Sequence, residues 1–297
     1  TGGTIIGDGG SINGADATAI LANQGLFVYR PFNEPMTVGT VDFSAPGNLV
    51  RYERDGNNQK VIGTTYHHLQ IGPDPLNANL NRVSQGPIQV NGNLTIEAGC
   101  RFLPKSHDLT VVGQTILGGS LYDDDAPGTN ALQDLIFEGG NLDGLPGDFG
   151  TFLINGNVDL TAGSGQMNEA TVNIAGTTTI GAGHSLEVAA IQGTKSFQAV
   201  NVQLAGSFSS TASSAATTLV FNGPVSNGGN FSLARGNYTF NDDFQTLSKG
   251  TFAFTEVLGD VEVFGQLLND GTFNLTGGNF ILHNQLSGSS SMTFNGN

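Results

Sequence analysis

The sequence predicts an all-β protein that folds as a parallel β-helix (β-solenoid) with coils of about 20 residues. Three observations lead to this prediction. Glycine makes up 44 of the 297 residues, apolar and polar residues alternate in short segments, and one pattern around a glycine recurs along the chain. Alternation with period 2 is typical of β-strands. A short repeat with glycine and asparagine turns is typical of solenoids, in which stacked coils bury a shared core.

The repeat is clearest between Ile88 and Gly119, where the sequence states VNGNLTIEAG and then TVVGQTILGG. In each copy the glycine occupies a position that should face inward, so we expect it to mark a bend between two short strands. Aligning the copies on this residue gives a series of anchors at a nearly constant spacing, as expected for stacked coils. The anchors are Gly92, Gly113, Gly139, Gly156, Gly176, Gly206, Gly223, Asp242, Gly265 and Asn284.

Two steps between anchors are longer than the rest, namely the step from Gly113 to Gly139 and the step from Gly176 to Gly206. We expect these steps to contain polar loops that project from the solenoid. An antiparallel sandwich or jelly roll is the alternative fold, but it gives no reason to repeat a glycine at one register.

The chain is expected to contain a short N-terminal part and one long domain. Residues 1–38 are rich in glycine and are interrupted by Pro31 and Pro35, which predicts an N-terminal cap or an irregular first coil. Residues 39–297 are predicted to form a single elongated β-solenoid. The ends of the sequence, TGGT and TFNGN, suggest a segment of a longer chain.

Charge is distributed unevenly. Residues 1–105 contain seven basic and eight acidic side chains, and residues 106–297 contain three basic and seventeen acidic ones, which gives net charges of −1 and −14. A surface so poor in lysine and arginine repels phosphate backbones, so nucleic acid is not an expected partner. No apolar run is long enough to form a membrane-spanning helix, so membrane insertion is not expected either. The acidity is expected to keep a large β-surface soluble.

Phenylalanine is concentrated late in the chain. Eleven of the nineteen phenylalanines follow position 200, and at coil spacing they are expected to stack inside the solenoid as an aromatic ladder. An exposed aromatic stripe for sugar binding is the alternative. The ladder residues are Phe208, Phe221, Phe231, Phe240, Phe244, Phe252, Phe254, Phe264, Phe273, Phe280 and Phe294.

The repeated strings resemble the repetitive β-strand proteins of Bacteroidetes that the type nine secretion system exports and that form surface adhesins or filaments. The resemblance rests on TTYHHLQI (64–71), IQVNGNLTIEAG (88–99) and HDLTVVGQTILGG (107–119), and it continues in LINGNVDLTAG, GTFNLTGG and SMTFNGN. It covers roughly residues 38–297, and similar strings occur in autotransporter passenger domains. The resemblance implies an extracellular, surface-displayed β-solenoid.

Carboxylates are the first candidates for chemistry, because β-helical polysaccharide lyases and hydrolases use clustered acids. The clusters here are Asp123–Asp125 and Asp242–Asp243. Adjacent strand residues point to opposite faces, so neither run forms a site by itself. Asp123–Asp125 precede a turn and are expected in a solvated loop, with surface Ca²⁺ as the alternative.

No other residue type forms a convincing site in the sequence. His67 and His68 are adjacent and are expected on opposite faces of a strand, while His107, His184 and His283 are scattered. Cys100 is the single cysteine and is expected to be a small buried or turn residue. We therefore predict no catalytic, cofactor-binding or metal-binding residues, and no cofactor.

The function expected from the sequence is a non-enzymatic structural or adhesive rod in an extracellular or cell-surface protein. Its expected partners are neighbouring repeats or subunits that stack end to end, and cell-surface or glycan ligands that bind its loops. The alternatives are a β-helical polysaccharide-active enzyme and a fibre like a phage tail spike.

Overall fold

The computed structural model describes residues 4–7, 13–20, 25–30, 37–54, 56–72, 80–123, 128–144, 151–168, 171–190, 195–212, 217–254 and 259–294. These residues contain strands and no helix. The strands are parallel and stack as a β-solenoid of about 11 turns with roughly 21 residues per turn, which confirms the predicted fold class. The chain divides into two compact units, Thr1–Asp143 and Gly144–Asn297.

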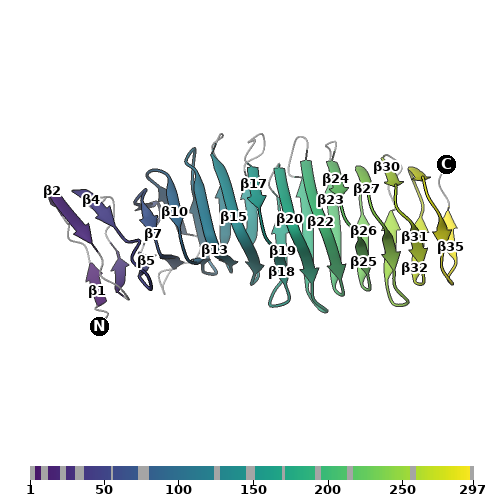
Figure 1. The fold of residues 1–297 in the computed structure, drawn as a ribbon, viewed down its shortest axis with the longest axis horizontal. Coiled ribbons are helices and arrows are strands. Elements are labelled where there is room, and N and C mark those ends of the chain that lie inside the picture. The colour runs from purple at the N-terminus through teal and green to yellow at the C-terminus, as the bar shows by residue number, and fades with distance from the viewer. Residues whose placement is uncertain are drawn as a thin grey trace. The chain divides into compact units, whose positions relative to one another are not determined.

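A complete turn contains three short strands. The chain changes direction between the first and second strands, at the position of the repeat glycine, and we call this change of direction the bend. It changes direction again between the second and third strands, and we call this second change the corner. First and second strands form one sheet and third strands form another. In Figure 1 the strands of successive turns lie side by side within each unit.

In the first unit, the sheet of first and second strands contains β1 (Thr4–Gly7), β3 (Leu26–Tyr29), β5 (Leu49–Glu53), β7 (Thr65–Tyr66), β8 (His68–Gly72), β10 (Ile88–Val90), β11 (Leu94–Ile96), β13 (Leu109–Leu117) and β15 (Thr129–Phe137). The third strands are β6 (Gln59–Val61), β9 (Leu80–Ser84), β12 (Cys100–Leu103), β14 (Ser120–Asp123) and β16 (Asn141–Gly144). Strands β2 (Asn13–Ile20) and β4 (Thr37–Asp42) pair only with each other, in a two-stranded sheet. Within residues 1–38, β1 and β3 already belong to the parallel ladder that continues to β5.

In the second unit, the sheet of first and second strands contains β17 (Thr151–Ile154), β18 (Val158–Leu160), β20 (Thr171–Ile180), β22 (Lys195–Leu204), β24 (Thr217–Phe221), β25 (Val225–Asn227), β27 (Asn237–Phe240), β28 (Phe244–Thr246), β30 (Asp260–Val263), β31 (Leu267–Asn269), β33 (Asn279–Leu282) and β34 (Leu286–Ser287). The third strands are β19 (Gly165–Met167), β21 (Ser185–Ala190), β23 (Ser207–Ala212), β26 (Asn230–Leu233), β29 (Thr251–Phe254), β32 (Thr272–Leu275) and β35 (Met292–Phe294).

The repeat glycine marks the bend, as predicted, because there is no room for a side chain there. A Cβ on Gly113 would lie 2.5 Å from the Gly92 carbonyl oxygen, and a Cβ on Gly176 would lie 2.3 Å from the Gly156 carbonyl oxygen. The bends of successive turns therefore approach each other backbone to backbone. Both β13 and β20 run through their bend as one strand with a register shift against the next turn.

Two of the ten predicted anchors are wrong. Gly139 and Gly206 lie beyond the second strand, at the corner, where Gly206 approaches the carbonyl oxygens of Gly181 and His184. In the turn of Gly206 the bend falls at Val200, against which Gly223 of the next turn packs. Glycines occur at bends and at corners alike, so the repeat pattern took these two corner glycines for bend glycines. With Val200 as the anchor, the step that begins at Gly176 becomes shorter and approaches the spacing of the other turns, so it no longer indicates an unusually long loop.

The core consists of the alternate, inward-facing residues of all three strands. In β29 the burial alternates, with Phe252 and Phe254 buried. Eight of the eleven late phenylalanines are buried, which confirms the aromatic ladder for them. Phe208, Phe231, Phe252 and Phe273 are register partners in consecutive third strands.

The ladder prediction is wrong for Phe264. This residue follows the buried Val263, so it has outward parity, and it is 43% exposed. Its ring stacks on that of His283, with centroids 4.3 Å apart. Phe280 and Phe294 lie in the final described turn, where Phe280 is half-buried and Phe294 is exposed.

Candidate functional site

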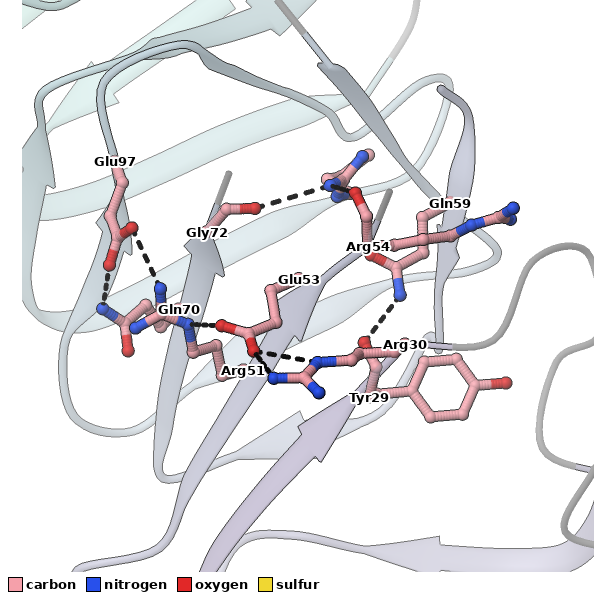
Figure 2. A network of polar contacts seen from close by, with 10 residues as sticks. Tyr29, Arg30, Arg51, Glu53, Arg54, Gln59, Gln70, Gly72 and Glu97 are labelled. Atoms are coloured by element: carbon pink, nitrogen blue, oxygen red, sulfur yellow. Dashed lines mark hydrogen bonds and ion pairs between the residues drawn. The ribbon is translucent and has the colours of Figure 1, made fainter. Parts of the chain in front are cut away.

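A network of polar contacts lies on the outer face of β3, β5, β8 and β11 (Figure 2). Arg30 follows β3 and donates from Nε to Glu53 Oε1 at 3.0 Å, while Arg51 Nε lies 2.5 Å from Glu53 Oε2. Arg51 also extends to Glu97, with Nη2 3.2 Å from Oε2, and Gln70 donates to the other oxygen of Glu97. We call these five residues the arginine–glutamate network.

The strand register brings these residues together. Arg30, Glu53, Gly72 and Glu97 occupy one row across four turns, because Tyr29 pairs with Tyr52, Glu53 pairs with Gly72, and Ile71 pairs with Ile96. Gly72 leaves its place in the row empty. A Cβ there would lie 2.9 Å from Arg51 Nε, so the guanidinium group lies over Gly72 and connects two carboxylates that are far apart in sequence.

Beneath this face, buried polar side chains bind backbone carbonyl groups. Arg82 in β9 is fully buried and donates to the carbonyl oxygens of Arg54, Gly56 and Asn81 at 2.8 to 3.2 Å. Its register partner Gln59 donates to the carbonyl oxygen of Tyr29 at 2.7 Å (Figure 2). These side chains satisfy backbone groups where the chain leaves the ladder, as buried carbonyl groups require.

A buried tyrosine pair has the same role. The hydroxyl oxygens of Tyr52 and Tyr66 are 2.9 Å apart, and Tyr66 donates to the Ile62 carbonyl oxygen at 2.6 Å. Burial raises the pKa of both hydroxyl groups. Because both side chains are fully buried, they have no access to a substrate and act as structural hydrogen-bonding groups.

The aspartate clusters predicted from the sequence differ in their environment. Asp123 is fully buried at the end of β14, where Oδ2 accepts a hydrogen bond of 2.8 Å from Asn130 Nδ2. The expectation of a solvated loop is therefore wrong for Asp123, because it shares the inward parity of Leu121. Asp124 and Asp125 lie outside the described residues. Asp242 and Asp243 are exposed at a bend, where Asp243 Oδ1 accepts from the backbone of Gln266.

His67 lies at the bend after β7, and His68 begins β8. Their ring centroids are 4.2 Å apart, so the prediction that the two side chains lie on opposite faces of a strand is wrong, because the chain changes direction at His67. His68 Nδ1 accepts a hydrogen bond of 2.9 Å from the backbone N–H of Asn93. Burial, and then the neighbouring His67, lower the pKa of His68. No group of three or more His, Cys, Asp or Glu side chains within the described ranges is placed to hold a metal ion.

Cys100 begins β12 and is buried. Burial raises the pKa of its thiol to about 11, which leaves almost no thiolate at neutral pH. The prediction of a small buried residue is confirmed, and burial outweighs the effect of the nearby Arg82 and Arg51 on the thiol.

Among the described residues, shallow polar grooves lie along the corners, and the lining of two of them is as follows. One, of about 310 Å³, lies in the first unit and is lined by Asn81, Gly99, Cys100, Arg101, Gly118, Gly119, Ser120, Gly139, Gly140 and Asn141. The other, of about 390 Å³, lies in the second unit and is lined by Gly183, His184, Ser185, Ala205, Gly206, Ser207, Gly229, Asn230 and Lys249. Neither groove has a carboxylate among its lining residues.

Sequence reasoning missed the arginine–glutamate network and the buried Arg82. The available signal was the concentration of basic residues, seven of ten, within the first 105 residues. The chain matches no protein-family model, and comparison with curated proteins and with solved structures finds no match. No helix in the described part of the chain is long and apolar enough to cross a membrane.

Proposed function

We propose that this chain is a non-enzymatic structural or adhesive scaffold, and that it serves an extracellular or cell-surface protein. The observation that carries the proposal is that its buried and networked polar side chains bind other groups of the solenoid itself. Arg51, Glu97, Arg82 and the buried tyrosines all bind groups within the solenoid, either across turns or at the ends of ladders. These contacts stiffen the stack of turns, and they give the polar side chains involved a structural role.

The grooves support the same proposal. Glycosidases place two carboxyl groups about 5 to 10 Å apart beside the scissile bond, whereas the lining of each described groove contains none. We propose surface display because the repeated strings resemble exported repetitive β-strand proteins. In this proposal ligands bind the loops that connect third strands to the next first strands, and most residues of these loops lie outside the described ranges. Neither nucleic acid nor a membrane interior is a partner.

The test is a paired assay on the purified chain. Neutral and acidic polysaccharides are incubated with the protein and followed for new reducing ends and for unsaturated products, while binding to the same immobilised glycans and to bacterial surfaces is measured in parallel. We expect no depolymerisation. Turnover of any glycan would refute the scaffold and favour a β-helical enzyme, and a stable trimer would favour a tail-spike-like fibre.

A further inference from the structure

The groove along the corners of the first unit combines one positive charge with uncharged polar side chains. Its volume is about 310 Å³, and Arg101 is the one charged residue in its lining. Asn81 pairs with Arg101 and Arg101 pairs with Ser120, so these three residues form one outward row across successive turns. Asn141 begins β16, the next strand of the same sheet, and also lines the groove. We call these four residues the corner row.

The guanidinium group of Arg101 is held in place without an ion pair. Its Cζ lies 4.4 Å from the centroid of the Tyr122 ring, in a cation–π contact. Within the described ranges no carboxylate or carbonyl group binds Arg101, whereas Arg51 binds two glutamates and the buried Arg82 binds backbone carbonyl groups. Stacking on a ring leaves the N–H groups of a guanidinium free for hydrogen bonds. Arg101 can therefore bind an anionic ligand in the groove.

The neutral residues of the corner row offer both donors and acceptors. The side-chain amides of Asn81 and Asn141 have no hydrogen-bond partner among the described residues, and both residues are half-buried beside the groove. Ser120 Oγ lies 3.5 Å from Asp143 Oδ2, and a hydroxyl group that donates one hydrogen bond can still accept another. Amide and hydroxyl groups that donate and accept match the hydroxyl groups of a sugar ring.

We propose that this groove binds an acidic glycan, with the carboxylate of a uronic acid residue on Arg101. A guanidinium group binds a carboxylate through two parallel N–H···O bonds, and stacking on Tyr122 fixes its orientation before the ligand arrives. Hydroxyl groups of the sugar then bind the neutral residues of the corner row. No carboxylate in the lining repels such a ligand, and the shallow groove lets the glycan chain continue beyond it. This inference rests on the proposed adhesive role, names its ligand class, and places a site at the corners in addition to the loops.

The groove of the second unit differs in its cation, which is Lys249. An ammonium group is a point charge and lacks the planar fork with which arginine matches a carboxylate. Lys249 also lies in an exposed turn, where its long side chain keeps its rotational freedom until a ligand binds. The uronic acid residue is therefore assigned to Arg101 in the first unit.

The test is isothermal titration calorimetry of the 297-residue chain with oligosaccharides of galacturonate, of mannuronate and guluronate, and of glucuronate. At a salt concentration of about 0.15 M, charges more than about 8 Å apart are largely screened, so the acidity of the rest of the chain has little effect. We expect binding of at least one uronate. Its methyl ester, which has the same sugar ring without the negative charge, should bind at least about tenfold more weakly.

Variants of the chain locate the site. Arg101→Gln should weaken binding about tenfold or more, because it removes the charged pair of hydrogen bonds. Arg235→Gln is the matched control, since it removes the same charge from an exposed arginine that lines neither described groove. Asn141→Ala should weaken binding about threefold, and it keeps the proposal testable if circular dichroism shows that Arg101→Gln folds poorly.

Each outcome decides the proposal. Absence of binding for every uronate, equal binding of the methyl ester, or equal weakening by Arg101→Gln and Arg235→Gln would overturn the site. Full binding by Asn141→Ala would remove the corner row from the ligand contacts and would overturn it as well. Loss of the site without glycan turnover leaves the scaffold role intact. Turnover of a bound uronate would instead refute the scaffold role and leave the binding site in place.

Discussion

Replacing Phe252 with alanine should remove a central contact of the aromatic ladder. The Phe252 ring is buried and lies 4.4 Å from the Phe273 ring at an interplanar angle of 14°. On its other side it lies 5.9 Å from the Phe231 ring. The backbone register fixes the spacing of these three turns, so the neighbours cannot move inward to fill the space. We therefore expect a loss of about 3–5 kcal/mol in the free energy of unfolding, as for other buried phenylalanines.

The measurement is equilibrium unfolding in guanidinium chloride, followed by far-ultraviolet circular dichroism and by tyrosine fluorescence, since the chain contains no tryptophan. Phe264→Ala is the control, because this phenylalanine is 43% exposed, and its loss should be below about 1 kcal/mol. Equal losses for the two variants, or a loss below about 1 kcal/mol for Phe252→Ala, would refute the ladder as a source of stability.

Three further predictions concern other sites. Burial raises the pKa of the Cys100 thiol from 9.0 to about 11. Cys100 should therefore react with iodoacetamide at pH 8 roughly 100-fold more slowly in the native chain than in the unfolded chain. Equal rates would contradict its burial. Gly176→Ala puts a Cβ 2.3 Å from the Gly156 carbonyl oxygen and should destabilise by about 1–3 kcal/mol. Gly86→Ala, with its nearest atom at 3.5 Å, should change the unfolding midpoint little, and the reverse order would disprove the packing argument. Since the pKa of His68 is lowered from 6.5 in the folded state, the unfolded chain binds the proton more readily, so stability should be full above pH 6.5 and fall as the pH drops. His68→Gln should flatten the curve between pH 7 and 5, and an unchanged curve would assign the loss to other groups.

The sequence predicts the solenoid because most turns repeat the same local pattern of alternating apolar residues around a glycine. The alternation around Gly113 and Gly176 specifies strands, a bend and an inward face without knowledge of any distant residue. The same local logic places Phe252 inside. It fails for Gly139 and Gly206 because bend and corner both require close backbone approach, and a glycine does not reveal which of the two it occupies.

Side-chain environments depend on the register between turns, which the sequence does not state directly. Asp123 stands before a proline–glycine turn and therefore suggests a solvated loop, yet strand parity places it inside with Asn130. Similarly, Phe264 is a large apolar residue and is therefore expected in the core, but it directly follows the inward-facing Val263 and so faces outward. For both residues parity decides burial, and a composition-based argument gives the wrong answer.

The arginine–glutamate network shows how far such register effects extend. Arg51 connects Glu53 to Glu97 only because the intervening row position is Gly72. Any side chain at residue 72 would displace the guanidinium group, even though Gly72 makes no ionic contact itself. An exposed ion pair contributes about 0–1 kcal/mol, so the main effect of the network is to fix the relative position of successive turns. The proposed scaffold role would require such rigidity. Because Gly72 has no side chain, Arg51 can reach past the turn of Gly72 and contact Glu97 in the turn beyond it.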